Sequence, residues 1–273
     1  MSGIITAGLV IGITGLIIGL LLGFAAIKFA VPVDEKEIAV RDLLPGNNCG
    51  GCGYAGCDAL AKAIAAGEAA VGACPVGGAA VAEKIGAVMG VEGGSAEKQV
   101  AFVKCTGTCD KATVKYNYYG VADCKNAAVV PGGGDKACAF GCLGDGSCVA
   151  ACQFDAIHIV NGVAVVDVEK CVACGKCKEE CPRQLIEMVP YSTAYAVGCN
   201  STEKGPKVKA ACQQGCIGCG ICAKQCEAGA IAVENNIAHI DQSKCTGCGK
   251  CAEKCPAKVI VKKLVEKTEG EVA

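Results

Sequence analysis

The longest apolar stretch of the chain lies at its N-terminus. Residues 4–30 are almost wholly apolar and carry no charge before Lys28. A helix rises about 1.5 Å per residue, so this stretch is long enough to cross a hydrocarbon core ~30 Å thick. A cleaved secretory signal has a basic start and a shorter apolar stretch, and neither is present. The pattern predicts a transmembrane helix over residues 1–30.

Short runs rich in β-branched residues occur twice in the second half of the chain, at 156–167 and at 230–241. Each run is interrupted near its centre by a turn signal, Asn-Gly at 161–162 and Asn-Asn at 235–236. These residue types tolerate the left-handed backbone that tight hairpin turns need. The sequence therefore predicts two β-hairpins.

Cysteines surround both hairpins in one repeated pattern, since the run that ends at Cys181 recurs 74 residues later in a run that ends at Cys255. The doubled C-x2-C-x2-C-x3-C spacing is typical of two 4Fe-4S clusters, in which three thiolates hold one cluster and the fourth reaches the other. Zinc sites and disulfide frameworks use other spacings. The repeat predicts two bicluster ferredoxin-like modules.

The spacing assigns ligands to three of the four clusters in these modules. In the second module, one cluster is held by Cys216, Cys219, Cys222 and Cys255. Its neighbour is held by Cys226, Cys245, Cys248 and Cys251. In the first module, one cluster is held by Cys152, Cys171, Cys174 and Cys177.

The fourth cluster departs from the pattern because Asp145 stands where the repeat requires a cysteine. A carboxylate binds the iron of such clusters less well than a thiolate. Cys138, one helical turn before Cys142, is close enough to substitute. We assign this cluster to Cys138, Cys142, Cys148 and Cys181. The alternatives are Asp145 as a weak fourth ligand, or a labile three-iron site.

A further cysteine motif follows the apolar N-terminal stretch. Its spacing is C-x2-C-x4-C-x16-C, with glycines that allow backbone amides to approach inorganic sulfur. Alanine-rich residues 58–70 predict a helix between the third and fourth cysteines. The motif predicts another 4Fe-4S site, and its spacing also permits zinc. Its ligands are Cys49, Cys52, Cys57 and Cys74.

These assignments give five clusters and leave five cysteines over: Cys105, Cys109, Cys124, Cys199 and Cys212. One hypothesis is a sixth cluster, in which Cys105, Cys109 and Cys124 are extra ligands joined by Cys138 or by one of the later two cysteines. The other is that all five are ordinary buried thiols.

The predicted fold class is α+β, with a single N-terminal transmembrane helix, a small helical 4Fe-4S domain and two bicluster ferredoxin-like modules. With 25 cysteines, five phenylalanines and no tryptophan, the bound clusters must serve as interior and staple. The expected divisions are a transmembrane helix at 1–30, a membrane-proximal 4Fe-4S domain at 31–92, a middle segment at 93–134, modules at 135–198 and 199–262, and a flexible tail at 263–273.

Charge and motifs exclude other classes of function. Basic and acidic residues are nearly balanced, with a formal net charge of −1, and stacking aromatics are scarce, so nucleic acid is not an expected partner. The glycine-rich stretches at 131–134 and 141–146 do not fit a dinucleotide-binding motif. Numerous reduced thiols favour the reducing cytoplasm, and Lys28 on the C-terminal flank of the span points the same way.

The order of these parts resembles the B subunit of the Rnf complex, a membrane-bound ferredoxin:NAD oxidoreductase that couples electron flow to Na+ or H+ translocation. The resemblance rests on the glycine-bearing span, the motif at 47–57 with its later Cys-Pro, and the segments 103–107 and 141–144. It covers most of the chain. A second module at 216–255 resembles the longer members of that family.

The resemblance implies a single-pass subunit of the cytoplasmic membrane, with its soluble domains in the cytoplasm. Reduced ferredoxin would be its electron donor, and other subunits of the complex its partners, with NAD reduced on one of those subunits. The alternative is a membrane-anchored electron donor to a redox-sensing regulator or another enzyme, without ion pumping. A small-residue face of the span favours packing against a partner helix. It is formed by Gly8, Gly12, Gly15, Gly19 and Gly23.

Overall fold

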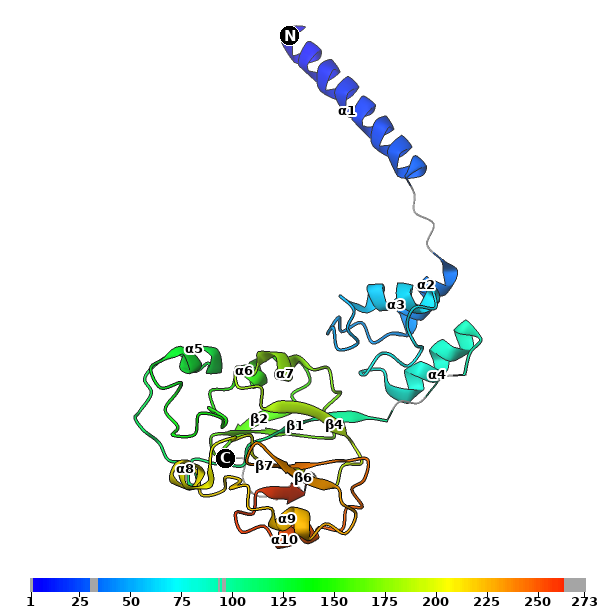
Figure 1. Ribbon diagram of the computed structural model, residues 1–273. Coiled ribbons are helices and arrows are strands. Elements are labelled where there is room, and N and C mark those ends of the chain that lie inside the picture. Colours follow the sequence, from blue (N-terminus) through cyan, green and yellow to red (C-terminus); the bar gives the residue numbers. More distant parts are fainter. Residues whose placement is uncertain (1, 30–33, 93, 95–96, 263–273) are drawn as a thin grey trace.

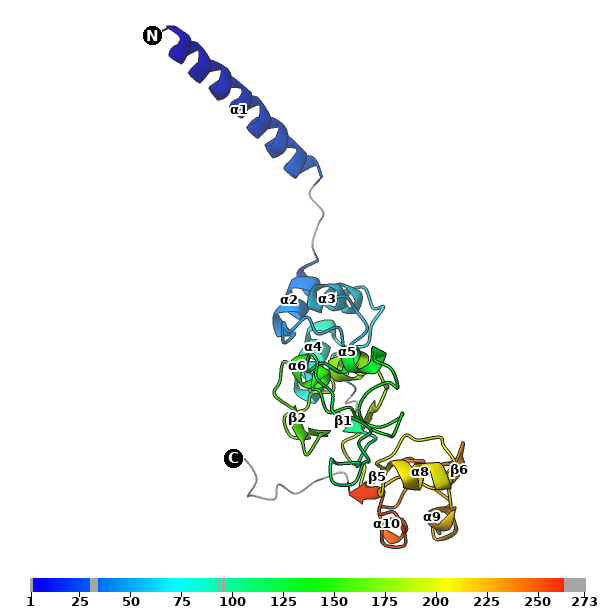
Figure 2. The ribbon, with the colours of Figure 1, turned by 90° about the vertical axis from the view of Figure 1, so that its left-hand side faces the viewer.

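The computed structural model describes residues 2–29, 34–92, 94 and 97–262. Helix α1 (Ser2–Lys28) stands apart from the other described elements, while the helices α2–α4 and then the strands follow along the molecule (Figures 1 and 2). Within α1, the apolar window Gly8–Ala25 is long enough to cross a membrane, and none of it is buried. It is the one such helix in the described part of the chain.

Three helices form a small domain after α1: α2 (Glu35–Leu43), α3 (Cys57–Ala65) and α4 (Gly78–Met89). Asp34 caps α2 by accepting the N–H of Lys36 at 2.9 Å. The helix expected over 58–70 ends earlier, at Ala65. The domain core consists of fully buried side chains, Val40, Leu60, Ile64 and Ile85 among them.

The first strand joins the middle of the chain to the region around the first hairpin. β1 (Gln99–Val103) pairs antiparallel with β4 (Ile186–Pro190), so that Val103 lies opposite Ile186. Val100 is fully buried in the resulting core. The expected middle segment 93–134 therefore contributes a strand to the first cysteine-rich unit.

The two expected hairpins are confirmed. β2 (Ile157–Val160) pairs with β3 (Val163–Val166), and β6 (Ile231–Glu234) pairs with β7 (Ile237–Ile240). Positive φ angles occur at both residues of each turn, as the turn signals predict: Asn161, Gly162, Asn235 and Asn236.

The second unit repeats the strand pairing of the first. β5 (Tyr195–Val197) pairs antiparallel with β8 (Ile260–Lys262), and Val197 lies opposite Ile260, which is 74 residues after Ile186. β5 precedes residue 199, where the second module was expected to begin. It pairs forward with β8, as β1 pairs with β4 in the first unit.

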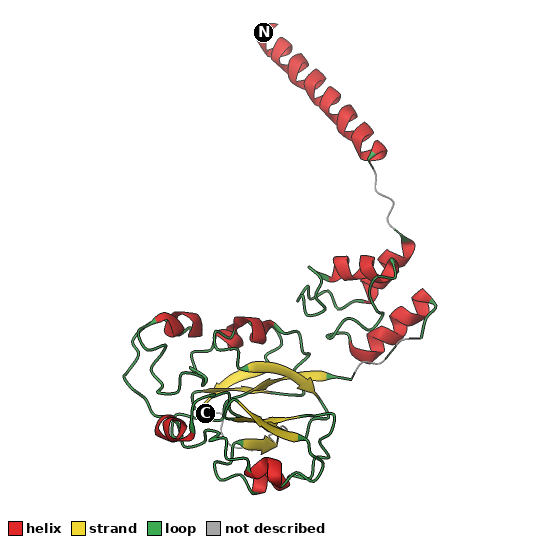
Figure 3. Cartoon of the chain, in the orientation of Figure 1, coloured by secondary structure: helices red, strands yellow, loops and turns green. Residues whose placement is uncertain are grey.

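Six short helices lie on two sides of the strands (Figure 3). They are α5 (Cys124–Val129), α6 (Ser147–Ala150), α7 (Lys176–Glu180), α8 (Gly205–Ala211), α9 (Ile221–Lys224) and α10 (Lys250–Glu253). Apart from α8, each has a cysteine as its first or second residue. The helix starts therefore place thiols toward the strand layer. The tail expected at 263–273 lies outside the described residues.

Candidate metal centres

Four cysteines of the first unit line one small cavity, of about 20 Å³. They are Cys152, Cys171, Cys174 and Cys177. Backbone N–H groups point at two of the sulfurs: Ala101 donates to Cys171 Sγ at 3.3 Å, and Ala156 donates to Cys152 Sγ at 3.4 Å. The structure thus brings together the four residues that the sequence grouped.

In the second unit, a cavity of similar size is lined by Cys216, Cys219, Cys222 and Cys255. A second group lies across the unit, where the thiols of Cys245 and Cys248 are close enough to influence the pKa of Cys251. Cys226, the fourth residue that the sequence assigned to this group, accepts the N–H of Ala230 at 3.3 Å. That bond repeats the one that Cys152 accepts in the first unit.

The membrane-proximal domain brings Cys52, Cys57 and Cys74 together in its core. Asn48 Oδ1 accepts the N–H of Cys57 at 2.8 Å and fixes the start of α3. Gly77 N–H donates to Cys74 Sγ at 3.4 Å. Cys49 is buried beside them, on the side that faces the first unit, and its thiol is close enough to influence the pKa of Cys174.

The cavity around the departure at Asp145 differs from the sequence expectation in one ligand. Three of the cysteines that line it belong to the expected set, and the fourth is Cys124, from the start of α5. Neither Cys138 nor Asp145 lines this cavity. The cysteine lining consists of Cys124, Cys142, Cys148 and Cys181.

Two side chains hold Cys124 at this cavity. Ser147 Oγ accepts the N–H of Cys124 at 2.7 Å and donates to Asp123 at 2.7 Å. Asp123 also caps α5 by accepting the N–H of Asn126. The sequence carried a local sign of this helix start, an Asp followed by Cys-Lys-Asn. It carried no sign that the helix packs against Ser147.

Cys138 lies on a different side of the first unit. Lys136 forms an isolated bridge with Val114, and Ala137 N–H donates to Thr113 O at 2.7 Å. These contacts draw the segment before Cys142 away from α6. Cys138 instead lines a separate cavity together with Cys105.

Burial raises the pKa of several cavity thiols. It raises the pKa of Cys148 and Cys177 to about 12, and the pKa of Cys199 and Cys222 to about 11. Burial is the largest cause, because a thiolate loses its hydration there, and neighbouring thiols add repulsion. These sites are therefore unfavourable for bare thiolates, and bound cations would be needed to stabilise them.

The cysteine groups suit clusters better than single ions. In residues 2–29, 34–92, 94 and 97–262, no group of three or more His, Cys, Asp or Glu side chains could hold one metal ion. Tetrahedral zinc needs four ligand atoms about 2.0–2.3 Å from one point. Wider cysteine cages, whose sulfurs accept backbone N–H bonds, fit iron-sulfur clusters.

Three segments of the chain match known families. Residues 44–76 match an Fe-S cluster family, residues 164–187 match the 4Fe-4S binding domain, and residues 215–259 match the 4Fe-4S dicluster domain. Together these segments contain three of the cysteine motifs identified above.

Several known proteins are similar over most of the chain, and each is the B subunit of a membrane complex. That of the Na(+)-translocating ferredoxin:NAD(+) oxidoreductase complex of Acetobacterium woodii is 47% identical, over 86% of this chain and 71% of that protein. That of the ion-translocating oxidoreductase complex of Methanosarcina acetivorans is 44% identical, over 84% and 87%. That of the proton-translocating ferredoxin:NAD(+) oxidoreductase complex of Clostridium ljungdahlii is 42% identical, over 89% and 86%.

Proposed function

Because the chain belongs to the family of B subunits of Rnf-type, ion-translocating oxidoreductase complexes, we propose that it takes electrons from reduced ferredoxin and relays them to its partner subunits. The protein is an iron-sulfur electron-transfer subunit. When bound, 4Fe-4S clusters accept and release single electrons. The chain's own contribution is to hold these clusters close to one another and to anchor them at a membrane.

The observation that carries the proposal is the set of cysteine cages that runs through the molecule. We assign five of them to 4Fe-4S clusters. The membrane-proximal cage is Cys49, Cys52, Cys57 and Cys74. The first module supplies Cys152, Cys171, Cys174 and Cys177, and also Cys124, Cys142, Cys148 and Cys181. The second module supplies Cys216, Cys219, Cys222 and Cys255, and also Cys226, Cys245, Cys248 and Cys251.

Neighbouring cages lie close together, which supports a continuous relay. Cys49 of the membrane-proximal cage is near Cys174 of the first module. Cys148 is near Cys177 and so connects the two cages of that module. These contacts order the cages from the helical domain into the first module.

Helix α1 supports a membrane anchor, and its glycine face supports contact with another subunit. A Cβ added at Gly8, Gly12, Gly15, Gly19 or Gly23 would meet no other atom within 4 Å, so this face is free to receive a second helix. The concentration of thiols and the basic Lys28 flank support a cytoplasmic location for the soluble domains. Nucleotide reduction and the ion pathway are assigned to partner subunits.

Anaerobic reduction by ferredoxin tests the proposal. The purified full-length protein should contain at least about 20 irons and as much acid-labile sulfide, and reduced ferredoxin should bleach its visible absorbance and produce 4Fe-4S resonance signals. Zinc in place of iron and sulfide would contradict the proposal.

A deletion strain separates ion pumping from the alternative role as donor to a redox regulator. Membrane vesicles from the deletion strain should lose ferredoxin-dependent NAD reduction and the accompanying ion uptake together. Complementation with the full chain should restore both activities. Retention of both activities in the deletion strain would favour the regulator-donor role.

A further inference from the structure

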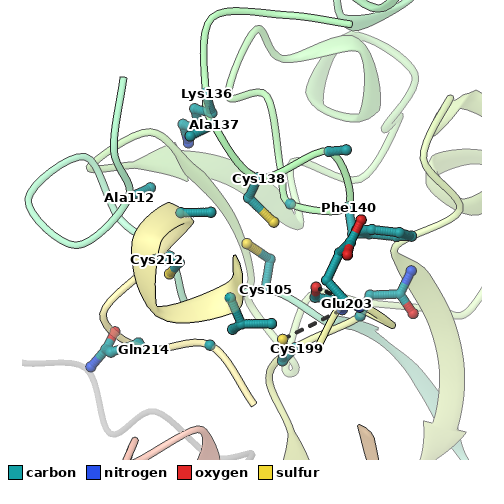
Figure 4. A pocket seen from close by; sticks show the side chains of 18 of the residues that line it. Cys105, Ala112, Lys136, Ala137, Cys138, Phe140, Cys199, Glu203, Cys212 and Gln214 are labelled. Carbon is teal, nitrogen blue, oxygen red and sulfur yellow. Dashed lines mark hydrogen bonds between the residues drawn. The ribbon is translucent and has the colours of Figure 1, made fainter. Parts of the chain in front are cut away.

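Four cysteines that lie outside the three family matches line one cavity between the two modules. This cavity has a volume of about 160 Å³. Cys105 and Cys138 come from the first module and its preceding segment, and Cys199 and Cys212 come from the start of the second. Figure 4 shows the four side chains around the same space.

The two pairs occupy equivalent positions in the duplicated fold. Cys105 comes two residues after β1, and Cys199 comes two residues after β5. Each sulfur accepts an equivalent backbone bond: Cys142 N–H donates to Cys105 Sγ at 3.3 Å, and Cys216 N–H donates to Cys199 Sγ at 3.4 Å. The thiols are therefore oriented by the same local structure in both copies.

The second member of each pair also corresponds. Cys138 precedes Cys142 by four residues, and Cys212 precedes Cys216 by four residues. Each module thus supplies one cysteine after its first strand and one before its first cage. The cavity lies where the two equivalent pairs meet.

Backbone hydrogen bonds hold the two halves together around this cavity. Thr106 N–H donates to Gly198 O at 3.0 Å, and Thr113 N–H donates to Ala211 O at 3.0 Å. Ala112 and Cys212 form an isolated bridge. The four thiols therefore belong to one ordered interface.

The walls of the cavity are close to the sulfurs. A Cβ at Gly141 would lie 3.4 Å from Cys138 Sγ and 3.6 Å from Cys105 Sγ. A Cβ at Gly107 would lie 3.0 Å from Cys212 Sγ and 3.8 Å from Cys105 Sγ. Glycine at both positions lets the backbone approach the thiols without a side chain between them, as a cluster pocket requires.

We propose that Cys105, Cys138, Cys199 and Cys212 hold a sixth 4Fe-4S cluster at the interface between the two modules. The proposal extends the proposed function, because it connects the cages of the first module to those of the second. The thiols are free of disulfide bonds, and the described residues contain no single-ion site. Buried Lys136 lines the same cavity and would offset part of the thiolate charge.

The assignment uses every cysteine of the chain but one. Cys109 is exposed and does not line the interface cavity. It is therefore a matched control for a ligand, because it lies in the same middle segment and has the same chemistry. Cys109→Ser should leave the iron content unchanged.

Iron, zinc and acid-labile sulfide should be measured in the anaerobically purified full-length protein and in two double variants, C105S/C138S and C199S/C212S. We expect about 24 irons in the unaltered protein and about 20 in each double variant. The quadruple variant should also retain about 20, because all four residues serve one cluster. A loss of about eight irons in the quadruple variant would overturn the shared site.

Native mass spectrometry of the unaltered protein gives a count that does not depend on the folding of a variant. Six clusters per chain are expected. Five clusters, with the double variants unchanged in iron, would overturn this inference and leave the proposed relay intact. Zinc at the interface beside five clusters would also overturn it, whereas a chain without clusters would contradict the proposed function itself.

Discussion

Gly51 packs directly against the backbone of Cys174, so that a Cβ at residue 51 would lie 2.8 Å from the Cys174 carbonyl oxygen and 3.0 Å from its Cα. The loop that carries Cys49 and Cys52 therefore touches the loop that carries a cage residue of the first module. A side chain at position 51 would push backbone against backbone, and neither loop could yield by changing a rotamer.

We expect Gly51→Val to separate the membrane-proximal cage from the first module while both keep their iron. Electron transfer between them should slow by roughly tenfold, equivalent to about 1.4 kcal/mol in activation free energy. Rapid-freeze paramagnetic resonance after mixing with reduced ferredoxin measures this rate. Gly94→Ala is the control, because a Cβ there meets no atom within 4 Å. Equal rates in both variants would show that the contact does not set the spacing.

Cys124 and Asp145 make opposite predictions about the altered cage of the first module. Cys124→Ser should lose about four irons or convert the site to a three-iron cluster, because this thiol lines the cavity. Asp145→Ala should keep its iron, because Asp145 does not line the cavity. Iron analysis with resonance spectra of the oxidised protein distinguishes the two variants. Loss of iron in the Asp145 variant alone would restore the carboxylate as ligand.

Ser147 is expected to control how firmly that cage holds its cluster. In Ser147→Ala, the buried N–H of Cys124 loses its acceptor, which costs about 1–3 kcal/mol. Iron should leave this site for a chelator roughly tenfold faster than in the unaltered protein. Ser243→Ala, at an exposed serine of the second unit, is the control. The idea fails if both variants release iron at the same rate.

Lys136 should raise the reduction potential of the neighbouring clusters. Its side chain is buried, and its Nζ donates to Gly162 O at 2.6 Å. Burial raises the pKa of both Cys142 and Cys212, and the charge of Lys136 opposes that rise. Lys136→Met should therefore shift at least one potential downward, on the order of tens of millivolts.

A redox titration followed by paramagnetic resonance measures the shift. Lys224→Met removes an exposed charge beside Cys222, where solvent screens it, and serves as the control. An unchanged potential in the Lys136 variant would mean that the buried charge is compensated elsewhere.

Removal of the clusters should unfold most of the chain after residue 97. The strands there are three to five residues long, and cysteines make up part of both core clusters. Chelated protein should lose the proton chemical-shift dispersion of the native state, whereas α1 should remain helical in detergent. Native-like dispersion in cluster-free protein would show that the apolar side chains suffice.

Local signals in the sequence predicted the hairpins and most of the cages, because turn residues and closely spaced cysteines act over a few positions. The turns at Asn161 and Asn235 are examples. The pairing of β1 with β4 could not be predicted this way, because its partners are distant along the chain. The exchange of Cys138 for Cys124 has the same origin, since it depends on how α5 packs against Ser147.

The equivalence of the two modules was visible as a constant offset between cysteines, and Cys138 and Cys212 obey it. Their meeting at one interface was not visible. A repeat in sequence specifies similar local structure in both copies, but it does not specify which faces of the copies touch. That depends on contacts such as Thr113 with Ala211.

The cavity between the modules also orders the events of biosynthesis. A ribosome releases the N-terminal residues first, so the cage that ends at Cys74 can be filled while the rest is still being made. The interface cavity draws its walls from residues 104–215 and exists only after both halves have emerged and docked. Iron delivery to this position would thus come late in maturation, and a chain truncated before Cys199 would lack half of its walls.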